Sequence, residues 1–144
     1  TCDLREAPKG ETNSDQPMPH PLITEADVQT LTNQEILAIN QDALGQQAEY
    51  MEALSTGTTD YSPSGYDVFV KDLTDSRIAV SITNRATSAA SVPAIPLTAI
   101  YLKANTRYIC REIWSQTEGE IENNLSVGSL NPCETRVYVL SKKE

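Results

Sequence analysis

Few side chains in this 144-residue chain have both a type and a setting that could support chemistry. His20 is the single histidine and lies between two prolines, with no serine or cysteine in a recognisable nucleophile motif, so no catalytic triad is indicated. Cys2, Cys110 and Cys133 show no C-x-x-C spacing, which predicts neither a zinc site nor a disulfide scaffold. The sequence also contains no glycine-rich phosphate loop or nucleotide fingerprint. We therefore expect no metal and no cofactor.

Two covalent features stay open at this point. Cys110 and Cys133 both fall in or beside predicted strands and could be bridged, although we favour Cys110 as a small buried hydrophobic residue. Asn124-Leu125-Ser126 is the only N-glycosylation sequon in the sequence. Such a sequon matters only in a secreted protein.

Trp114 and Tyr108 lie on the same face of a predicted strand. Exposed aromatic rings on such a face can form a carbohydrate-binding platform. Packing in a core or between domains explains these two rings better. Arg107 and Arg111 interrupt the apolar pattern on the other face of the strand, and we expect both faces of the strand to be covered.

Beyond residue 65 the hydrophobic pattern has a period of two, which is typical of strands. Residues 66–73 and 77–83 form a predicted hairpin around the turn 74–76. Further predicted strands are 91–95, 98–102, 107–115 and 135–141, and we expect one weaker strand within 119–130. Short alternating strands at this spacing predict a mostly β fold, an antiparallel β-sandwich of the Greek-key type.

The segment 32–45, TNQEILAINQDALG, predicts a short helix with its own start and stop signals. Thr32 followed by Glu35 fits a capping box. After an apolar face, Asp42 lies in the turn that ends the helix and Gly45 closes that turn.

As a string of residues, INQDALG (39–45) resembles the INQD-x-LG motif at the barrel exit of melibiase-type α-galactosidases, glycoside hydrolase family 27. PLIT (21–24) resembles the last barrel strand of that family. The predicted hairpin, which ends in Asn84, resembles the first hairpin of its C-terminal domain, and RYICREIWS (107–115) its V-R-D-L-W strand. The resemblance runs from about residue 21 to the end of the chain. It implies the end of a (β/α)₈ barrel followed by a β-sandwich.

The resemblance predicts four regions: a disordered or unrelated leader, the last β/α unit of a barrel, a linker or loop-rich segment, and the sandwich. Their expected bounds are 1–17, 18–45, 46–65 and 66–144. A complete barrel needs about 250 residues, so we expect this chain to lack one.

We expect no catalytic residue in the chain, although it has 20 aspartates and glutamates. A retaining glycosidase needs two carboxyl groups about 5–5.5 Å apart, and the resemblance places both catalytic aspartates of the family before residue 1. Asp27 follows the strand-like segment, but its spacing from Thr24 is explained by a capping box. Asp42 is explained by its turn.

The resemblance therefore implies a C-terminal fragment of an α-galactosidase-like glycosidase that hydrolyses terminal α-D-galactosyl residues. This chain would supply the structural sandwich and be inactive alone. An alternative is a stand-alone carbohydrate-binding or interaction module derived from that domain. The choice between galactose and N-acetylgalactosamine depends on barrel loops.

The expected partners follow from charge and from the resemblance. A net charge of −9 argues against nucleic acid, because phosphate binding needs clustered Lys and Arg. The sequence contains no apolar stretch of about 18 residues, the length that would predict a membrane span. The N-terminal residues lack the apolar core of a signal peptide. The family implies an extracellular, lysosomal or vacuolar location, galactosides as ligands of the intact enzyme, and the missing barrel as partner.

Self-association of the chain is a further expectation. The segment 21–45 carries an apolar face that suits barrel neighbours, and an uncovered face of this kind favours association. Its members are Leu22, Ile23, Val28, Leu31, Ile36, Leu37 and Ile39.

Overall fold

The predicted hairpin forms part of the main sheet. In the computed structural model, which describes residues 24–56 and 65–144, β2 (Tyr66–Leu73) pairs with β3 (Arg77–Asn84) along its whole length. Asp75 and Ser76 reverse the chain with left-handed φ angles of 61° and 55°. Alternate side chains point inward, so Val68, Val80 and Ile82 are completely buried.

Six strands form the main sheet, in the order β1-β2-β3-β10-β6-β7, and every pairing is antiparallel. The C-terminal strand β10 lies between β3 and β6, so the chain returns to the middle of the sheet. This arrangement confirms the predicted antiparallel fold. The other strands span Glu49–Tyr50 (β1), Arg107–Glu112 (β6), Thr117–Glu122 (β7) and Thr135–Lys142 (β10).

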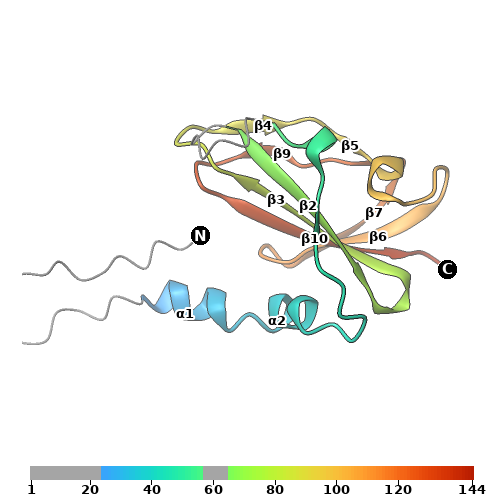
Figure 1. Cartoon of the computed structure of the whole chain (residues 1–144), viewed down its shortest axis with the longest axis horizontal. Helices are drawn as coiled ribbons and strands as arrows, with labels where there is room; N and C mark the ends of the chain where they lie inside the picture. Colours follow the sequence, from blue (N-terminus) through green and yellow to red (C-terminus); the bar gives the residue numbers. More distant parts are fainter. Residues whose placement is uncertain (1–23, 57–64) are drawn as a thin grey trace, which may run out of the picture.

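A second layer covers the inner face of this sheet (Figure 1). It contains two short antiparallel pairs, β4 (Ala90–Val92) with β9 (Gly128–Leu130) and β5 (Ile95–Pro96) with β8 (Asn124–Leu125). The core lies between the layers. Its most deeply buried members include Val68, Val80, Ile82, Leu97, Ile100, Leu125, Leu130 and Leu140.

Three of the predicted strand positions were wrong. The predicted strand 91–95 is divided between β4 and β5. The segment 98–102 belongs mostly to a 3-10 helix, η3 (Leu97–Ile100), which ends at Tyr101 with a left-handed φ of 66°. The segment 119–130 contains β8, β9 and most of β7, because left-handed residues at Asn123 and Gly128 turn the chain twice.

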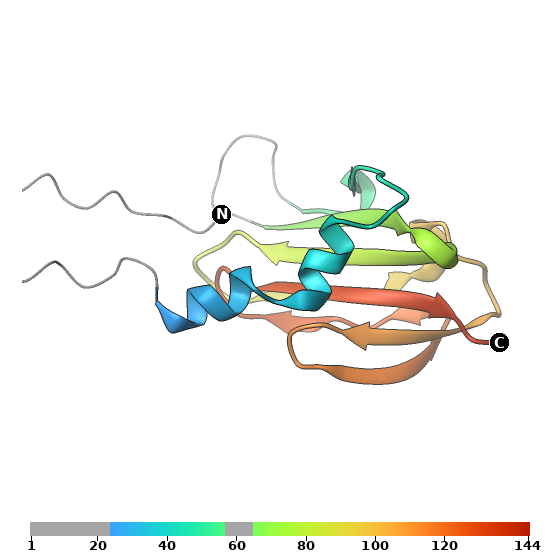
Figure 2. The same cartoon turned by 90° about the horizontal axis from the view of Figure 1, so that it is seen from below.

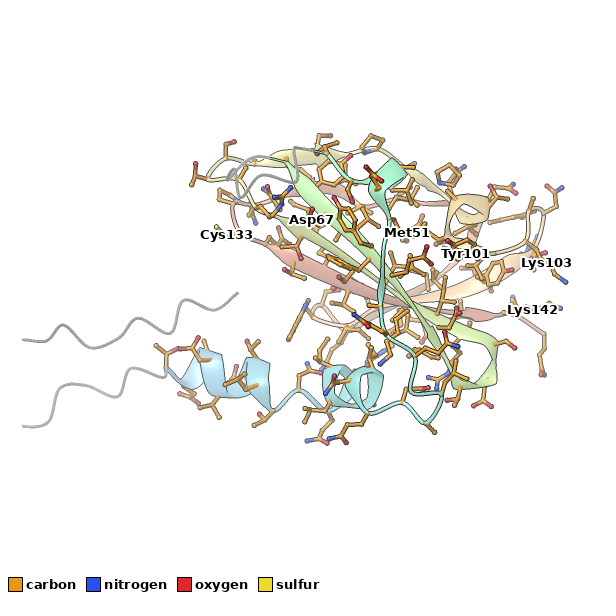
Figure 3. The ribbon with its side chains drawn as sticks, in the orientation of Figure 1. Met51, Asp67, Tyr101, Lys103, Cys133 and Lys142 are labelled. Carbon is orange, nitrogen blue, oxygen red and sulfur yellow. The ribbon has the colours of Figure 1, made fainter. Side chains whose placement is uncertain are left out.

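Part of the predicted linker adds a strand to the edge of the main sheet. β1 adds to β2, and the 3-10 helix η1 (Glu52–Leu54) follows it. Met51 packs against the core, and the Tyr101 hydroxyl donates to the Glu49 carboxylate at 2.9 Å (Figure 3). The four predicted regional boundaries remain predictions.

Two short helices lie on the outer face of the main sheet, α1 (Glu25–Leu31) and α2 (Gln34–Asn40). Figure 2 views this face and shows α2 crossing in front of the strands. No helix in the described ranges is long and apolar enough to cross a membrane.

The predicted cap of α2 was wrong by one residue. Asn33, not Thr32, is the N-cap, and its side-chain oxygen accepts from the amides of Glu35 and Ile36 at 3.0 Å each. Thr32 ends α1 instead, and its hydroxyl donates to the Val28 carbonyl at 2.7 Å. The Glu35 carboxylate is thereby left available for another partner.

Candidate functional site

The candidate site is the contact between α2 with its exit turn and the outer face of the main sheet, called here the helix–sheet contact. Its strongest polar link joins Glu35 on α2 to Arg111 on β6. The guanidinium donates from Nε to Oε2 at 2.6 Å and from Nη2 to Oε1 at 2.7 Å. Bidentate geometry makes this pair more directional than an ordinary surface ion pair. These hydrogen bonds from Arg111 hold the pKa of Glu35 below its ordinary value.

A lysine from β2 binds the C-terminal end of α2. Lys71 Nζ donates to the carbonyl oxygens of Ile39 at 2.6 Å and Asn40 at 3.4 Å. The last carbonyls of a helix lack intrahelical partners and carry partial negative charge. Lys71 therefore satisfies and stabilises the end of α2 from the sheet side.

Asp42 joins the exit turn to the tip of the hairpin. Its carboxylate accepts from the Leu44 amide at 3.0 Å, the Thr74 amide at 2.9 Å and the Thr74 hydroxyl at 2.8 Å, and lies 3.7 Å from Arg77. Burial raises the pKa of Asp42, but these hydrogen bonds and the charge of Arg77 outweigh it, so the pKa is lowered. The prediction of a turn residue holds, and Asp42 has a second, long-range role as well.

Apolar packing completes the helix–sheet contact. Four buried side chains lie outside the main core cluster: Leu73, Ala79, Ile113 and Val137. They line two pockets together with Ile36 and Ile39 of α2. An outer sheet face would normally be solvated, so their burial indicates that α2 is an integral cover of the sandwich.

Helix α1, which precedes α2, is not packed against the sheet in this way. Thr24 and Asp27 form the predicted capping box of α1, which accounts for Asp27 without a catalytic role. Val28 and Leu31 on this helix are 47% and 59% exposed. α1 therefore presents apolar side chains that nothing in the described part of the chain covers.

The two aromatic candidates do not share a surface. Tyr108 lies in the core at 4% exposure, and its hydroxyl accepts from the Lys103 amide at 3.0 Å. Trp114 lies beyond the end of β6 and is 38% exposed. The predicted pair therefore cannot form a single sugar-binding platform.

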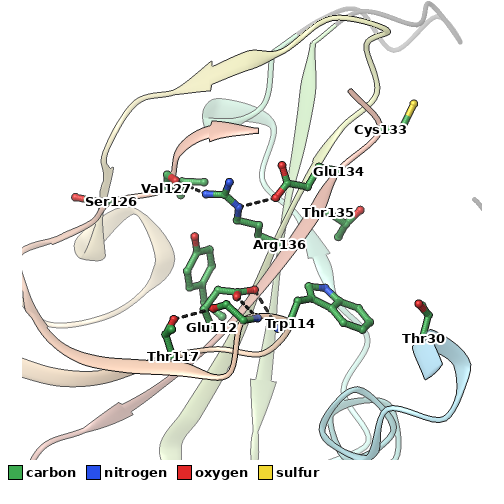
Figure 4. Close-up of a pocket in the computed structure, with 12 residues that line it drawn as sticks. Thr30, Glu112, Trp114, Thr117, Ser126, Val127, Cys133, Glu134, Thr135 and Arg136 are labelled. Carbon is green, nitrogen blue, oxygen red and sulfur yellow. Dashed lines mark hydrogen bonds and ion pairs between the residues drawn. The ribbon is translucent and has the colours of Figure 1, made fainter. Parts of the chain in front are cut away.

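Trp114 lines an open cleft at one end of the sandwich (Figure 4). The Glu112 carboxylate in this cleft accepts from the amides of Trp114 and Ser115 at 3.1 and 2.6 Å. Arg136 donates to Glu134 at 2.8 Å, and hydrogen bonds from the Asn131 amide and Arg136 lower the pKa of Glu134. A general acid needs a raised pKa, so Glu134 is unsuited to that role.

Both described cysteines are free thiols, which answers the open question of a bridge between them. Burial raises the pKa of the Cys110 thiol to about 11, so it stays protonated and behaves as the small buried hydrophobic residue that we favoured. Cys133 is exposed in the turn before β10. His20 and Cys2 lie outside the described residues, and within those residues no group of three or more potential ligands could hold a metal ion.

Sequence reasoning missed the residues that attach α2 to the sheet. Arg111 was considered only as a charge that interrupts one face of a predicted strand, and Lys71 was given no role. The signal in the sequence was a charged residue between apolar residues on the outer face of a strand. Any strand with a solvent-exposed face can show this pattern. Identifying the partner of each charge required the three-dimensional position of α2.

Comparisons with known proteins agree with this architecture. The family model described as the alpha galactosidase C-terminal beta sandwich domain matches residues 63–140. A protein named "Probable alpha-galactosidase A" from Aspergillus terreus is 34% identical over 107 residues, which cover 74% of this chain and 18% of that protein.

Two solved structures share the fold. α-Galactosidase I from Mortierella vinacea has a TM-score of 0.67 at 19% identity, over 82% of this chain and 29% of that one. A family 27 β-L-arabinopyranosidase from Geobacillus stearothermophilus has a TM-score of 0.65 at 18% identity, over 84% of this chain and 25% of that one. The chain spans less than a third of each of these three proteins. It belongs to the family of α-galactosidase C-terminal β-sandwich domains.

Proposed function

We propose that this chain provides the structural C-terminal β-sandwich of an α-galactosidase-like glycosidase and anchors the helix that leaves the catalytic barrel. The intact enzyme would hydrolyse terminal α-D-galactosyl residues with carboxylates outside this chain. The observation that carries the proposal is the helix–sheet contact, in which the segment resembling the barrel exit is bound at Glu35, Asp42 and the end of α2.

The physical role of the sandwich is to fix the position of α2. Three polar links and a buried apolar patch hold the helix at both ends and along its length. The exposed apolar residues of α1, Val28 and Leu31, are then free to pack against the barrel. Loss of the contact would leave the barrel exit unsupported.

Galactose is the sugar we assign, with support from the name of the Aspergillus terreus relative. The arabinopyranosidase from Geobacillus stearothermophilus shares the fold, and we propose that barrel loops, rather than the sandwich, select the sugar. By the same family membership we propose an extracellular or lysosomal or vacuolar location.

A chimera tests this proposal. The segment of the Aspergillus terreus protein that aligns with this chain is replaced by the corresponding residues of this chain, and hydrolysis of an aryl α-galactoside is measured. We expect an active, soluble chimera, whereas the isolated chain should show no turnover above a heat-killed control. An insoluble or inactive chimera, or turnover by the isolated chain, would contradict the proposal.

The exposure of Trp114 supports one second candidate, a carbohydrate-binding module. Because Trp114 is the only tryptophan, its fluorescence reports directly on the cleft. A saturable change in fluorescence when galactose is titrated into the full chain would favour this candidate. The change should be absent in Trp114→Phe, whose tyrosine emission serves as the control signal. Under the structural proposal, galactose causes no saturable change.

A further inference from the structure

The sequon Asn124-Leu125-Ser126 takes no part in the helix–sheet contact, and its position in the fold suits a covalent modification. We propose that Asn124 is an N-glycosylation site that receives one oligosaccharide from a polyprenyl-pyrophosphate-linked donor. The inference rests on the proposed function only in requiring export through the secretory pathway.

Asn124 in β8 and Ser126, which directly follows β8, both face outward. Leu125, between them, is 1% exposed and lies in the core. Successive side chains of an extended chain point to opposite sides, so Asn124 and Ser126 both point away from the core. Both residues are exposed.

The chain around Asn124 is a turn at the surface. Asn123 precedes it with a left-handed φ of 65°, which separates β7 from β8. Across β8, the pairing partner of Asn124 is Pro96. The neighbouring Asn123 begins no sequon, because Leu125 occupies the third position where serine or threonine is required.

The proposed reaction is a glycosyl transfer. The side-chain amide nitrogen of Asn124 forms a bond to the anomeric carbon of the donor sugar and gives up one proton. The bond between that carbon and the pyrophosphate oxygen breaks, and the polyprenyl pyrophosphate leaves with the electron pair. The secretory oligosaccharyltransferase catalyses the step and reads the Ser126 hydroxyl as part of the sequon.

The location of β8 keeps the glycan away from the helix–sheet contact. β8 pairs with β5 in the second layer, whereas α1 and α2 lie on the opposite side of the main sheet (Figure 1). A glycan at Asn124 therefore leaves the helix–sheet contact free.

The test uses the full 144-residue chain behind a yeast secretion signal, with cells and medium both analysed. We expect peptide-N-glycosidase treatment to lower the mass by one glycan and to convert Asn124 to aspartate, located by peptide mass spectrometry in heavy-oxygen water. Asn124→Gln and Ser126→Ala should both abolish the mass shift. The matched control Ser129→Ala, a neighbouring exposed serine outside the sequon, should keep it.

Asn124→Gln and Ser126→Ala are used together so that a folding defect in one variant does not decide the result. Ser126→Ala retains the acceptor asparagine and removes only the hydroxyl of the sequon. An unmodified wild-type chain in both fractions would overturn the inference, as would a mass shift that persists in Asn124→Gln. This test supplies its own secretion signal and does not measure activity. Its result is therefore independent of the result obtained with the chimera.

Discussion

At the scale of single residues, Asn84 shows how one buried amide joins three parts of the fold. The side chain is completely buried at the end of β3. Its nitrogen donates to the carbonyls of Ser88 at 2.8 Å, Leu130 at 3.4 Å and Asn131 at 2.9 Å, and its oxygen accepts from the Ala86 amide at 3.0 Å. Every polar atom of the side chain thus has a partner, as a buried amide requires.

Replacement of Asn84 should be among the most damaging single changes in the sandwich. Asn84→Ala leaves the Ala86 amide and two or three carbonyls without partners, which we expect to cost about 3 kcal/mol in the free energy of unfolding. Asn84→Asp should cost at least as much at neutral pH, because a carboxylate cannot donate. Urea unfolding measures both, with the exposed Asn40→Ala as control. A cost for Asn84→Ala within about 0.5 kcal/mol of that control would refute the role.

The Glu35–Arg111 pair predicts a specific dependence of stability on pH. The pKa of Glu35 is lowered below its ordinary value of 4.5 in the folded chain. Its stabilising contribution is therefore complete above pH 4.5 and is lost as the pH falls through the folded-state pKa. Thermal unfolding of the wild type and Glu35→Gln from pH 7 to pH 3 should show a gap in Tm that narrows below about pH 4.5. A gap that stays constant across this range would mean that Glu35 acts without its charge.

At the scale of elements, α2 is stabilised by the sheet more than by its own sequence. A helix of 7 residues is too short to be stable alone in water. Asn33 caps its start, while Arg111 and Lys71 bind its side and its end. The helix thus depends on residues that follow it by at least thirty positions in the chain.

The apolar half of the helix–sheet contact can be tested by a matched pair of truncations. Ile39→Ala removes half-buried methyl groups that pack near Val137 and Ile113. We expect it to lower the free energy of unfolding by about 1–2 kcal/mol. Leu31→Ala on α1, which is 59% exposed, should change it by less than about 0.5 kcal/mol. Equal effects of the two substitutions in guanidinium unfolding would argue against α2 as a cover of the sheet.

Local patterns were sufficient to predict the long elements of this fold. The hairpin of β2 and β3 was predicted from alternation and a short polar turn, and β10 from alternation alone. The short strands β5 and β8 were beyond such reasoning, since each has only 2 residues and no period can be read. The segment 98–102 looked like a strand because Thr98, Ile100 and Tyr101 are residue types common in strands. Burial of Leu97 and Ile100 favours the compact turn of η3.

The helix–sheet contact was only partly predictable. INQDALG indicated a helix and a turn, and both are present. The cap shifted from Thr32 to Asn33 because either side chain can accept from amides two or three residues ahead, and tertiary packing decides between them. The partners of Glu35 and Asp42 lie 76 and 32 residues away, a distance over which a single sequence carries no pairing signal.

At the scale of the whole molecule, the described part of the chain is a sandwich with α2 fixed outside it and α1 extending the same face. Ile36, Leu37 and Ile39, which we expected to be uncovered, are half-buried, whereas Val28 and Leu31 are exposed. Among the described members of that predicted face, the exposed ones are therefore on α1, and Leu22 and Ile23 lie outside the described residues.

Self-association of the isolated chain should depend on this helix. We expect a concentration-dependent rise in the sedimentation coefficient of the full chain, because exposed apolar faces associate. The double substitution Val28→Ser and Leu31→Ser should reduce the rise, whereas Thr30→Ser on the same helix should not. A wild-type chain that stays monomeric at high concentration would contradict this expectation.

The central claim is that the sandwich stabilises a glycosidase by binding the helix at the barrel exit. The most direct measurement is the half-life of α-galactosidase activity in the chimera at a raised temperature, with Arg111→Ala against the control Arg107→Ala. Arg107 lies on the same strand and has an exposed partner, Glu122, at 3.7 Å. We expect a shorter half-life and an unchanged initial kcat for Arg111→Ala, with Arg107→Ala indistinguishable from the parent chimera. Equal half-lives for all three, or a loss of kcat without any change in half-life, would contradict it.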